Sequence, residues 1–237
     1  MNANSEIRIA EIFQSIQGEG PTAGRRALFV RVAGCTLDCS WCDTADVWKQ
    51  KGTRWLPKNL AQYLATVYED AFRSGYRLIL TGGSPLAQQE GLSQMLAELR
   101  NLFDGAFAPV EVETEGTIEP TTDFFAQVGQ FNVSIKLANS GMPKDRRIVS
   151  KAIDFHVMTQ TRSVFKFVVS KPADILEILE LQPKFEIPAR QTWLMPCAST
   201  RAEHEKLAPS VVHACMEHGF NFSPRLQVVI WDRTVGV

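Results

Sequence analysis

The stretch Cys35-Thr-Leu-Asp-Cys39-Ser-Trp-Cys42 places three thiols within one short loop, where they can converge on a single metal centre. A structural zinc site normally takes four protein ligands. No fourth cysteine or histidine lies near this loop in the sequence, and Cys197 and Cys215 are distant. Three thiolates suit an iron–sulfur cubane whose fourth iron stays open for a small molecule. We therefore expect Cys35, Cys39 and Cys42 to hold a [4Fe–4S] cluster, with zinc as the alternative.

Around this loop, β-branched and apolar runs alternate with segments of helical periodicity. Strands are expected at Ile7–Phe13, Ala27–Val32, Tyr76–Leu80, Val110–Thr114, Asn132–Leu137, Val164–Val169, Thr192–Met195 and Leu226–Trp231. Helices are expected at Asn59–Ser74 (with Leu60, Leu64, Val67 and Ala71 on one stripe), Glu90–Leu102, Ala173–Leu181 and Arg201–His218. Strands separated by helices favour a parallel sheet with crossover connections. The order predicts an α/β fold with an open or partial parallel barrel, in one domain over residues 1–237.

Composition limits the possible functions. The 25 Lys and Arg residues nearly balance the 26 Asp and Glu residues, and a net charge of -1 disfavours nucleic-acid binding and favours a small-molecule substrate. The N-terminal segment has no secretory signal, and no apolar run is long enough to span a membrane. Five cysteines, three of them clustered, fit a reducing compartment. We expect a soluble cytoplasmic protein that does not bind membranes.

A second motif follows an expected strand at Thr81-Gly82-Gly83-Ser84-Pro85. Paired glycines let backbone approach a ligand closely, although such a sequence is often only a turn. Together, the CxxxCxxC spacing with Trp41 and this loop resemble the radical S-adenosylmethionine superfamily, whose usual motif is Gly-Gly-Glu-Pro. The resemblance implies that S-adenosylmethionine binds the open iron and is cleaved to a deoxyadenosyl radical. Ser84 replaces the usual glutamate, which leaves its side-chain role open.

Further motifs narrow the resemblance to one family. They are Gln17-Gly-Glu-Gly20, Gly24-Arg25, Phe29–Cys35, Cys42-Asp-Thr44, Glu113-Thr-Glu-Gly-Thr117, Ser134-Ile-Lys136 and Trp231–Val237. Over essentially the whole chain, they resemble the 7-carboxy-7-deazaguanine synthases. The resemblance implies conversion of 6-carboxy-5,6,7,8-tetrahydropterin to 7-carboxy-7-deazaguanine with loss of ammonia, a carbon–nitrogen lyase reaction of queuosine and 7-deazapurine biosynthesis. It also implies Mg²⁺, a homodimer and an electron donor such as a flavodoxin.

Site residues follow from these motifs. Residues expected at the cofactor are Trp41, Gly82, Gly83, Ser84, Glu113, Thr114, Ser134 and Lys136. Gln17, Glu19 and Arg31 are expected at the substrate, because a carboxylate suits the guanidine-like pterin edge and an arginine suits the substrate carboxylate. Thr44 is expected to bind Mg²⁺. Among the substrate candidates, Gln17 and the residues around Arg201 are the weaker ones, and structural roles stay open for them. No catalytic side chain is expected beyond the cluster and the cofactor radical.

Structural interpretations of the same residues stay open. Glu19 can cap a turn, Arg31 can form only an ion pair, and Thr44 can cap a helix. Lys136 at a strand end can simply be solvated. The four histidines are not clustered and are expected to be structural. Two other functions also stay open: a glycyl-radical activating enzyme, and a zinc-binding adaptor without enzymatic activity.

Overall fold

Within residues 5–105 and 108–234, the part of the chain that this computed structural model describes, nine strands form one sheet. Its order is β3-β1-β2-β4-β5-β6-β7-β8-β9. The strands are β1 (Ile7–Ile16), β2 (Arg26–Val32), β3 (Thr53–Trp55), β4 (Arg77–Gly82), β5 (Val110–Thr114), β6 (Gln130–Val133), β7 (Ser163–Val169), β8 (Thr192–Pro196) and β9 (Asn221–Phe222). The start of the N-terminal segment and the end of the Trp231–Val237 motif lie outside the described residues.

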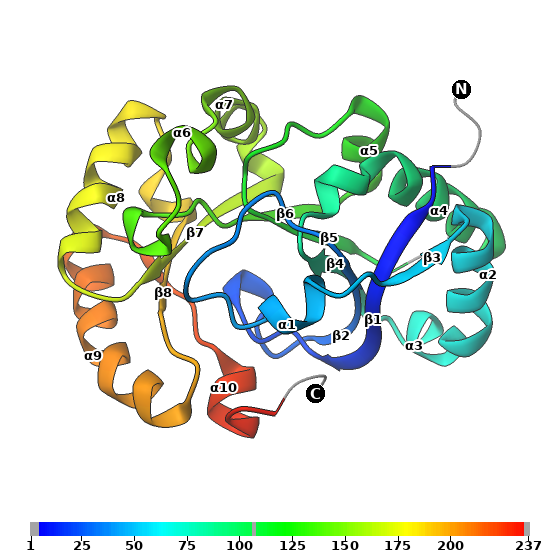
Figure 1. Ribbon diagram of the computed structural model, residues 1–237, viewed down its shortest axis with the longest axis horizontal. Helices are drawn as coiled ribbons and strands as arrows, with labels where there is room; N and C mark the ends of the chain where they lie inside the picture. The colour runs from blue at the N-terminus through cyan, green and yellow to red at the C-terminus, as the bar shows by residue number, and fades with distance from the viewer. Residues whose placement is uncertain (1–4, 106–107, 235–237) are drawn as a thin grey trace.

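Helices lie along the outside of the curved sheet, while α1 lies over its open side (Figure 1). Their bounds are α1 (Ala45–Trp48), α2 (Pro57–Val67), α3 (Glu69–Arg73), α4 (Gln89–Leu102), α5 (Thr122–Gln127), α6 (Lys144–Arg147), α7 (Ser150–Met158), α8 (Ala173–Lys184), α9 (Arg201–His218) and α10 (Leu226–Trp231). Short 3₁₀ turns connect several elements: η1 (Gly20–Thr22), η2 (Pro85–Gln88), η3 (Ala138–Ser140), η4 (Gln160–Arg162) and η5 (Ala189–Gln191). The sequence had not predicted β3, β9, α1, α5, α6 or α7.

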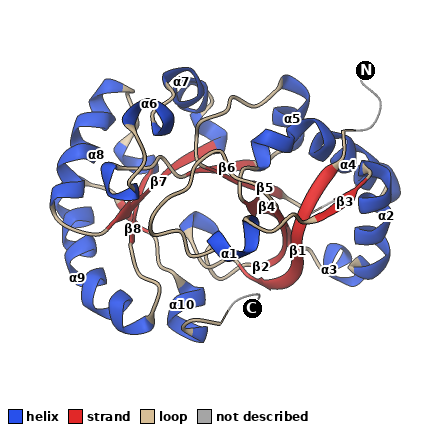
Figure 2. Cartoon of the chain, viewed as in Figure 1, coloured by secondary structure: helices blue, strands red, loops and turns tan. Residues whose placement is uncertain are grey.

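The sheet is parallel from β2 through β9, and only β1 pairs in antiparallel fashion, with β2 and β3. Most of these parallel strands are joined by helical crossovers, as parallel pairing requires. The sheet curves without closing, so the expectation of an open parallel α/β barrel is confirmed (Figure 2). Because parallel strands all end at the same edge, the loops after β2, β4, β5, β6, β7 and β8 gather there.

Core packing explains why the expected helices formed. The α4 side chains Leu92, Leu96 and Leu99 are fully buried, as their spacing predicted. They belong to one hydrophobic cluster with strand residues such as Leu80 and Val112. Burial on this scale provides the main drive for folding and holds the strand ends in fixed positions.

The expected single helix Asn59–Ser74 is two helices in the structure. It breaks at Tyr68, whose backbone (φ -118°, ψ 24°) is not helical. The Tyr68 hydroxyl donates a hydrogen bond to the Ile12 carbonyl at 3.4 Å, so this side chain is fixed by the sheet rather than by helix periodicity. Val67, the last residue of α2, is 52% exposed, so its expected place on the buried stripe is wrong.

The expected strand Leu226–Trp231 is wrong, because this segment is helix α10. Its β-branched residues favour a strand locally, but the sheet edge beside β8 is already taken by β9. The Leu226 amide instead donates to the Gly18 carbonyl at 3.0 Å. A tertiary contact therefore overrides local propensity here. Strand β6 is also shorter than expected and ends at Val133, which leaves Ser134 and Lys136 in the following loop.

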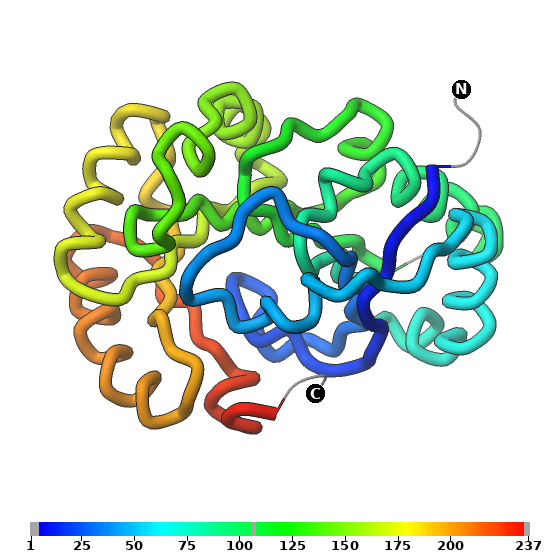
Figure 3. Tube along the Cα trace, viewed as in Figure 1, coloured from blue at the N-terminus to red at the C-terminus, as the bar shows by residue number. Residues whose placement is uncertain are grey.

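The segment after β1 meets the segment before α10 on the open side of the barrel. Beside the Gly18–Leu226 bond, the Gly20 amide donates to Ser223 Oγ at 2.8 Å. The N-terminal blue loop and the C-terminal red segment therefore lie together in the trace (Figure 3). Among the described residues, no helix has both the length and the apolar character needed to cross a bilayer.

Candidate active site

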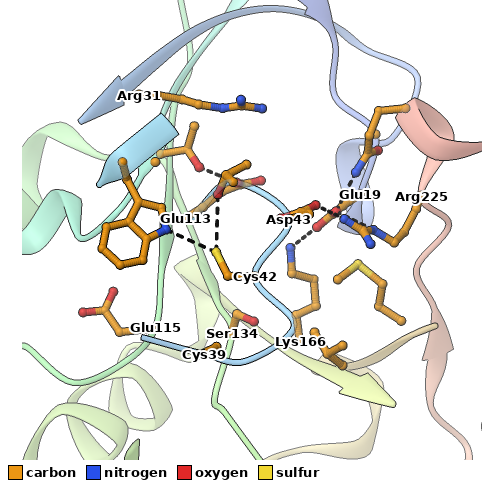
Figure 4. A pocket seen from close by; sticks show the side chains of 18 of the residues that line it. Glu19, Arg31, Cys39, Cys42, Asp43, Glu113, Glu115, Ser134, Lys166 and Arg225 are labelled. Carbon is orange, nitrogen blue, oxygen red and sulfur yellow. Dashed lines mark hydrogen bonds and ion pairs between the residues drawn. The ribbon is translucent and has the colours of Figure 1, made fainter. Parts of the chain in front are cut away.

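One pocket opens at the carboxyl edge of the parallel strands and contains nearly all the predicted site residues (Figure 4). Those that line it are Gln17, Glu19, Arg31, Cys35, Cys39, Trp41, Cys42, Thr44, Gly82, Gly83, Glu113, Thr114, Ser134 and Lys136. Ser84 is the exception, because it is fully buried behind the pocket wall. Residues from the parallel strands β2, β4, β5, β6, β7 and β8, or from the loops that follow them, line this space, as expected for a parallel barrel. The segment after β1 and the segment around α10 complete the lining.

The three loop cysteines are free and partly buried, and protein groups point toward two of the sulfurs. Trp48 Nε1 donates to Cys42 Sγ at 3.2 Å, and the Leu37 amide donates to Cys35 Sγ at 3.5 Å. Burial first, and then the Glu115 carboxylate, raises the pKa of the Cys35 thiol. Hydrogen bonds to sulfur stabilise thiolate ligands of a cluster, so these donors fit a cluster site.

The cysteine loop supplies three thiols, one fewer than the four protein ligands of a structural zinc site. A cubane takes each of three thiolates on a different iron and leaves the fourth iron open. Cys197, which is remote in sequence, lines the same pocket. Its charged neighbours are Arg225, Asp174 and Asp43, so it lies toward the other end of the pocket.

The Gly82-Gly83 pair brings two loops into contact. A Cβ on Gly83 would lie 1.8 Å from the Gly34 carbonyl oxygen, and Gly82 adopts φ +106° against Val32. Only glycine allows this approach without displacing the backbone. The Ser84 amide then donates to the Gly34 carbonyl at 2.8 Å. The pair therefore fixes the cysteine loop against the end of β4.

Polar side chains on β5 and the loop after β6 form the floor of the pocket. Glu113 accepts hydrogen bonds from Thr81 at 2.6 Å and from Gln17 at 3.1 Å. Lys136 Nζ donates to Ser134 Oγ at 2.8 Å and lies 5.4 Å from the centre of the Trp41 ring. Lys136 is therefore held inside the pocket rather than fully solvated. Thr114 is nearly buried and accepts a hydrogen bond from the Gly116 amide at 3.1 Å.

A buried charge cluster forms the opposite wall. Glu19 pairs with Lys166 and, at 3.3 Å, with Arg225, and it accepts a bond from Gln227 at 2.8 Å. Arg225 also pairs with Asp43 and donates to the Ala198 carbonyl. Glu19 precedes η1 without capping it, so the turn-cap interpretation does not hold. Figure 4 shows the cations around the carboxylate.

Electrostatics in this cluster favour the charged forms. Burial alone would raise the pKa of the Glu19 carboxyl, but Lys166 and Arg225 outweigh burial and lower it to about 2. Burial likewise opposes the charge on Lys166, yet Glu19 and Glu113 raise the pKa of Lys166 above its ordinary value. The pocket wall therefore carries fixed, paired charges at neutral pH.

Lys166, Arg225 and Gln227 are site residues that sequence reasoning missed. Lys166 is a lone charge within the buried strand β7, which is a usable signal because unpaired lysines are rarely buried. Arg225 lies just before Leu226–Trp231, the segment that was expected to be a strand, and Gln227 is its second residue. Nothing local in the sequence indicated that this segment returns to Glu19.

Two predicted residues keep structural contacts beside the pocket. Arg31 pairs with Glu11, and its guanidinium carbon lies 4.9 Å from the centre of the Phe13 ring, while the residue still lines the pocket. Thr44 precedes α1 but its side chain does not cap that helix. Its Oγ1 lies 3.7 Å from Cys42 Sγ. The helix-cap interpretation of Thr44 therefore does not apply.

Arg201 and the histidines do not line the pocket. Arg201 donates to the Val229 carbonyl at 2.8 Å and to the Ile230 carbonyl at 3.1 Å, so it holds α10 against α9. His156 is fully buried, and burial lowers its pKa to about 4. Arg201 therefore has a structural contact instead of the substrate contact considered from the sequence.

An open parallel barrel with three cysteines in the loop after β2 and a Gly-Gly loop after β4 defines the class of radical S-adenosylmethionine enzymes. Solved structures share this fold. The chain matches QueE from Escherichia coli with TM-score 0.65 and 22% identity, over 92% of this chain and 93% of that one. It matches Streptococcus suis SuiB, solved with S-adenosylmethionine, with TM-score 0.55 and 14% identity, over 80% of this chain and 47% of that one.

Sequence comparison identifies the family. Residues 16–118 match the 4Fe-4S single cluster domain. The chain is 33% identical over the full length of both proteins to a 7-carboxy-7-deazaguanine synthase from Pyrobaculum aerophilum. It is 31% identical to one from Halobacterium salinarum, over 95% of this chain and 91% of that protein. The chain belongs to the 7-carboxy-7-deazaguanine synthase family.

Proposed function

We propose that this chain catalyses the reaction of its family, the ring contraction of 6-carboxy-5,6,7,8-tetrahydropterin to 7-carboxy-7-deazaguanine with release of ammonia. One observation carries the proposal: the cysteine loop, the Gly-Gly loop and the Gln17–Gly20 segment meet in one pocket. These segments are far apart in the sequence, and each bears a family motif. The pocket therefore brings cofactor-binding and substrate-binding groups within reach of one another.

The residues present fit the cofactors. The three thiols with their hydrogen-bond donors suit a [4Fe–4S] cluster, and the glycine pair leaves bare backbone beside it for S-adenosylmethionine. When bound, the reduced cluster and S-adenosylmethionine supply the deoxyadenosyl radical that starts the ring contraction. Lys136 provides an ammonium for the methionine carboxylate of the cofactor, and Glu113, Thr114 and Ser134 provide polar contacts for its ribose.

Substrate orientation falls to the two walls of the pocket. Arg31 is the cation for the substrate carboxylate, and Glu19 is the acceptor for the pterin edge. Glu19 already accepts hydrogen bonds from Lys166, Arg225 and Gln227. Glu19 Oε1 already accepts from both Arg225 and Gln227, so a contact of the pterin with both carboxylate oxygens requires one donor to leave. We expect the neutral side chain of Gln227 to release its hydrogen bond to Glu19. Gln17 holds this wall in place through Glu113 and the Glu19 amide.

The remaining parts of the proposal concern the protein as a whole. We propose that residues 1–237 act as a single domain and as a homodimer in the cytoplasm, with an electron donor such as a flavodoxin. A net charge of -1 supports a small-molecule substrate rather than nucleic acid. Queuosine or another 7-deazapurine is the expected end product of the pathway.

The direct test is anaerobic turnover. Reconstituted protein is incubated with dithionite, S-adenosylmethionine and the carboxy-tetrahydropterin, and 7-carboxy-7-deazaguanine is detected by mass spectrometry. Iron–sulfur absorption with product formation supports the proposal. Cofactor cleavage without product would favour a glycyl-radical activating enzyme, and stoichiometric zinc without cleavage would favour an adaptor.

Replacing Arg31 with glutamine should weaken substrate binding about tenfold to a hundredfold, because a buried polar contact to the substrate carboxylate is lost. S-adenosylmethionine cleavage in the absence of substrate should continue. Binding is measured by equilibrium titration of the pterin, and cleavage by deoxyadenosine formation. Glu11→Gln is the matched control, because it removes the same ion pair and keeps the arginine. Equal loss in both variants would show that only the ion pair matters.

Replacing Thr44 with alanine should lower the apparent magnesium affinity of turnover or abolish magnesium stimulation. Magnesium keeps several waters and needs few protein oxygens, so one hydroxyl beside the cluster loop can be its protein ligand. The cluster should persist, because Thr44 is not one of its thiol ligands. A magnesium titration of turnover, with iron content measured alongside, provides the readout. Identical magnesium dependence in variant and parent would contradict the role of Thr44.

A further inference from the structure

Glu115 belongs to the Glu113–Thr117 motif and lies between the cofactor candidates Glu113 and Thr114 and the end of the motif. It lines the pocket and is only 5% exposed. A buried carboxylate normally has a cation or several donors around it. Only one of the two Glu115 carboxylate oxygens has hydrogen-bond partners, and the unpaired oxygen points to a ligand.

All hydrogen bonds of Glu115 reach one of its two oxygens. Oε1 accepts from Ser84 Oγ and from Thr36 Oγ1, each at 2.6 Å, and from Thr117 Oγ1 at 2.9 Å. Oε2 is buried and has no hydrogen-bond partner among the described residues. The hydroxyls fix the carboxylate and leave one oxygen for a donor that the protein does not supply. Desolvating a carboxylate oxygen without a partner is unfavourable, so a bound donor would be stabilised strongly here.

The position of this oxygen indicates the kind of donor. Ser84 Oγ, which bonds to Glu115, also lies 3.7 Å from Cys35 Sγ. Lys136 lies over the ring of Trp41 in the same cysteine loop. An anion and a cation therefore flank the cysteine loop. The methionine part of S-adenosylmethionine is a zwitterion with one ammonium and one carboxylate. Lys136 is the cation for the carboxylate, which leaves the ammonium for Glu115.

Ser84 explains why this chain uses position 115. The usual motif carries glutamate at the position of Ser84, but Ser84 Oγ here lies within a hydrogen bond of the Glu115 carboxylate. A glutamate at position 84 would reach the space that Glu115 fills. The usual motif supplies its carboxylate from the loop after β4, whereas this chain supplies a carboxylate to the same space from the loop after β5.

We propose that Glu115 takes the place of the missing motif glutamate and binds the α-ammonium of S-adenosylmethionine. Ser84 is then a positioning residue, because it holds the carboxylate and accepts a bond from the Thr36 amide at 3.0 Å. This inference rests on the proposed function only in that S-adenosylmethionine is the cofactor.

The test compares two ligands on anaerobically reconstituted protein by equilibrium binding. S-adenosylmethionine carries the ammonium, and 5′-methylthioadenosine lacks the whole amino-acid part. In Glu115→Gln, affinity for S-adenosylmethionine should fall about tenfold to a hundredfold, since a charge-assisted hydrogen bond is lost. Affinity for 5′-methylthioadenosine should change less than about threefold, and iron and sulfide content should match the parent.

The exchange variant Ser84→Glu with Glu115→Ser returns the carboxylate to the usual motif position. It should recover S-adenosylmethionine affinity to within about fivefold of the parent. If Glu115 only stabilised the neighbouring loops, this recovery would not be expected. Glu119→Gln is the matched control, because Glu119 pairs with Lys151 outside the pocket. If Glu115→Gln fails to load a cluster, the exchange variant decides the question.

Three results would overturn the inference: unchanged S-adenosylmethionine affinity in Glu115→Gln, equal weakening of both ligands, or an exchange variant with a full cluster and weak S-adenosylmethionine binding. Failure of the unaltered protein to bind S-adenosylmethionine would instead contradict the proposed function. The two failures are therefore distinguishable.

Discussion

Alanine at any one of Cys35, Cys39 or Cys42 is expected to abolish the [4Fe–4S] cluster and reduce S-adenosylmethionine cleavage to background. Each thiolate would hold a different iron of the cluster, and no other cysteine lies in the loop to replace it. Iron and sulfide analysis with visible absorption measures the cluster, and deoxyadenosine formation measures cleavage. The three variants should fail alike, because the loop supplies the full set of protein ligands.

Cys197→Ala is the control for these variants, because Cys197 lines the same pocket without belonging to the loop. It should keep a full cluster. Retention of a complete cubane with normal cleavage in any loop variant would refute the ligand assignment. Cluster loss in Cys197→Ala would show that the pocket contains a fourth thiol ligand.

Glu19→Gln is expected to lower the free energy of unfolding of the apoprotein by about 3 kcal/mol. The change leaves Lys166 buried beside a neutral amide, and breaking a buried ion pair costs roughly 3–5 kcal/mol. For a chain of this size, the thermal midpoint should fall by about 6–12 °C. Substrate binding should weaken as well, since the acceptor for the pterin edge is lost.

The pH dependence of stability follows the same pair. The pKa of Glu19 is lowered in the folded protein, so its contribution is present above the ordinary carboxyl pKa and is lost as pH falls toward about 2. The parent should therefore lose more stability than Glu19→Gln on acidification through this window. Chemical unfolding at several pH values measures the difference.

Two further variants isolate the cause. Lys166→Met in the Glu19→Gln background removes the unpaired charge and should restore much of the stability, but not substrate binding. Glu69→Gln breaks an exposed pair with Arg73 and should change stability by less than about 1 kcal/mol. An unchanged unfolding free energy in Glu19→Gln would contradict the buried-pair assignment.

Much of this site was predictable because parallel strands end at one edge. Cys35 and Gly83 follow β2 and β4, and Glu113 lies near the end of β5, so the topology alone places them together. Runs of strand-forming or helix-forming residues also predicted the bounds of β2, β5 and α9 closely, because local propensity and burial agree in these elements. Motifs at strand ends are therefore the part of a site that sequence reveals best.

What the sequence could not show depends on contacts across the whole chain. The break at Tyr68 and the helical α10 arise where a distant backbone carbonyl takes the hydrogen bond. Arg225, which lies just before the expected strand Leu226–Trp231, is a partner of Glu19. No local pattern predicts that Glu19 pairs with Arg225, because neither residue is unusual for its own segment.

The contact between the segment after β1 and the segment around α10 sets the order in which the protein can mature during synthesis. Glu19 meets Arg225 and Gln227 across separations of 206 and 208 residues. A ribosome adding about 5–20 residues per second needs roughly 10–40 s to make that length of chain. For most of this interval the cysteine loop has been made without its finished pocket, and its thiols are open to oxidation. Cluster insertion is therefore best suited to the completed chain, after the last segment has closed the wall.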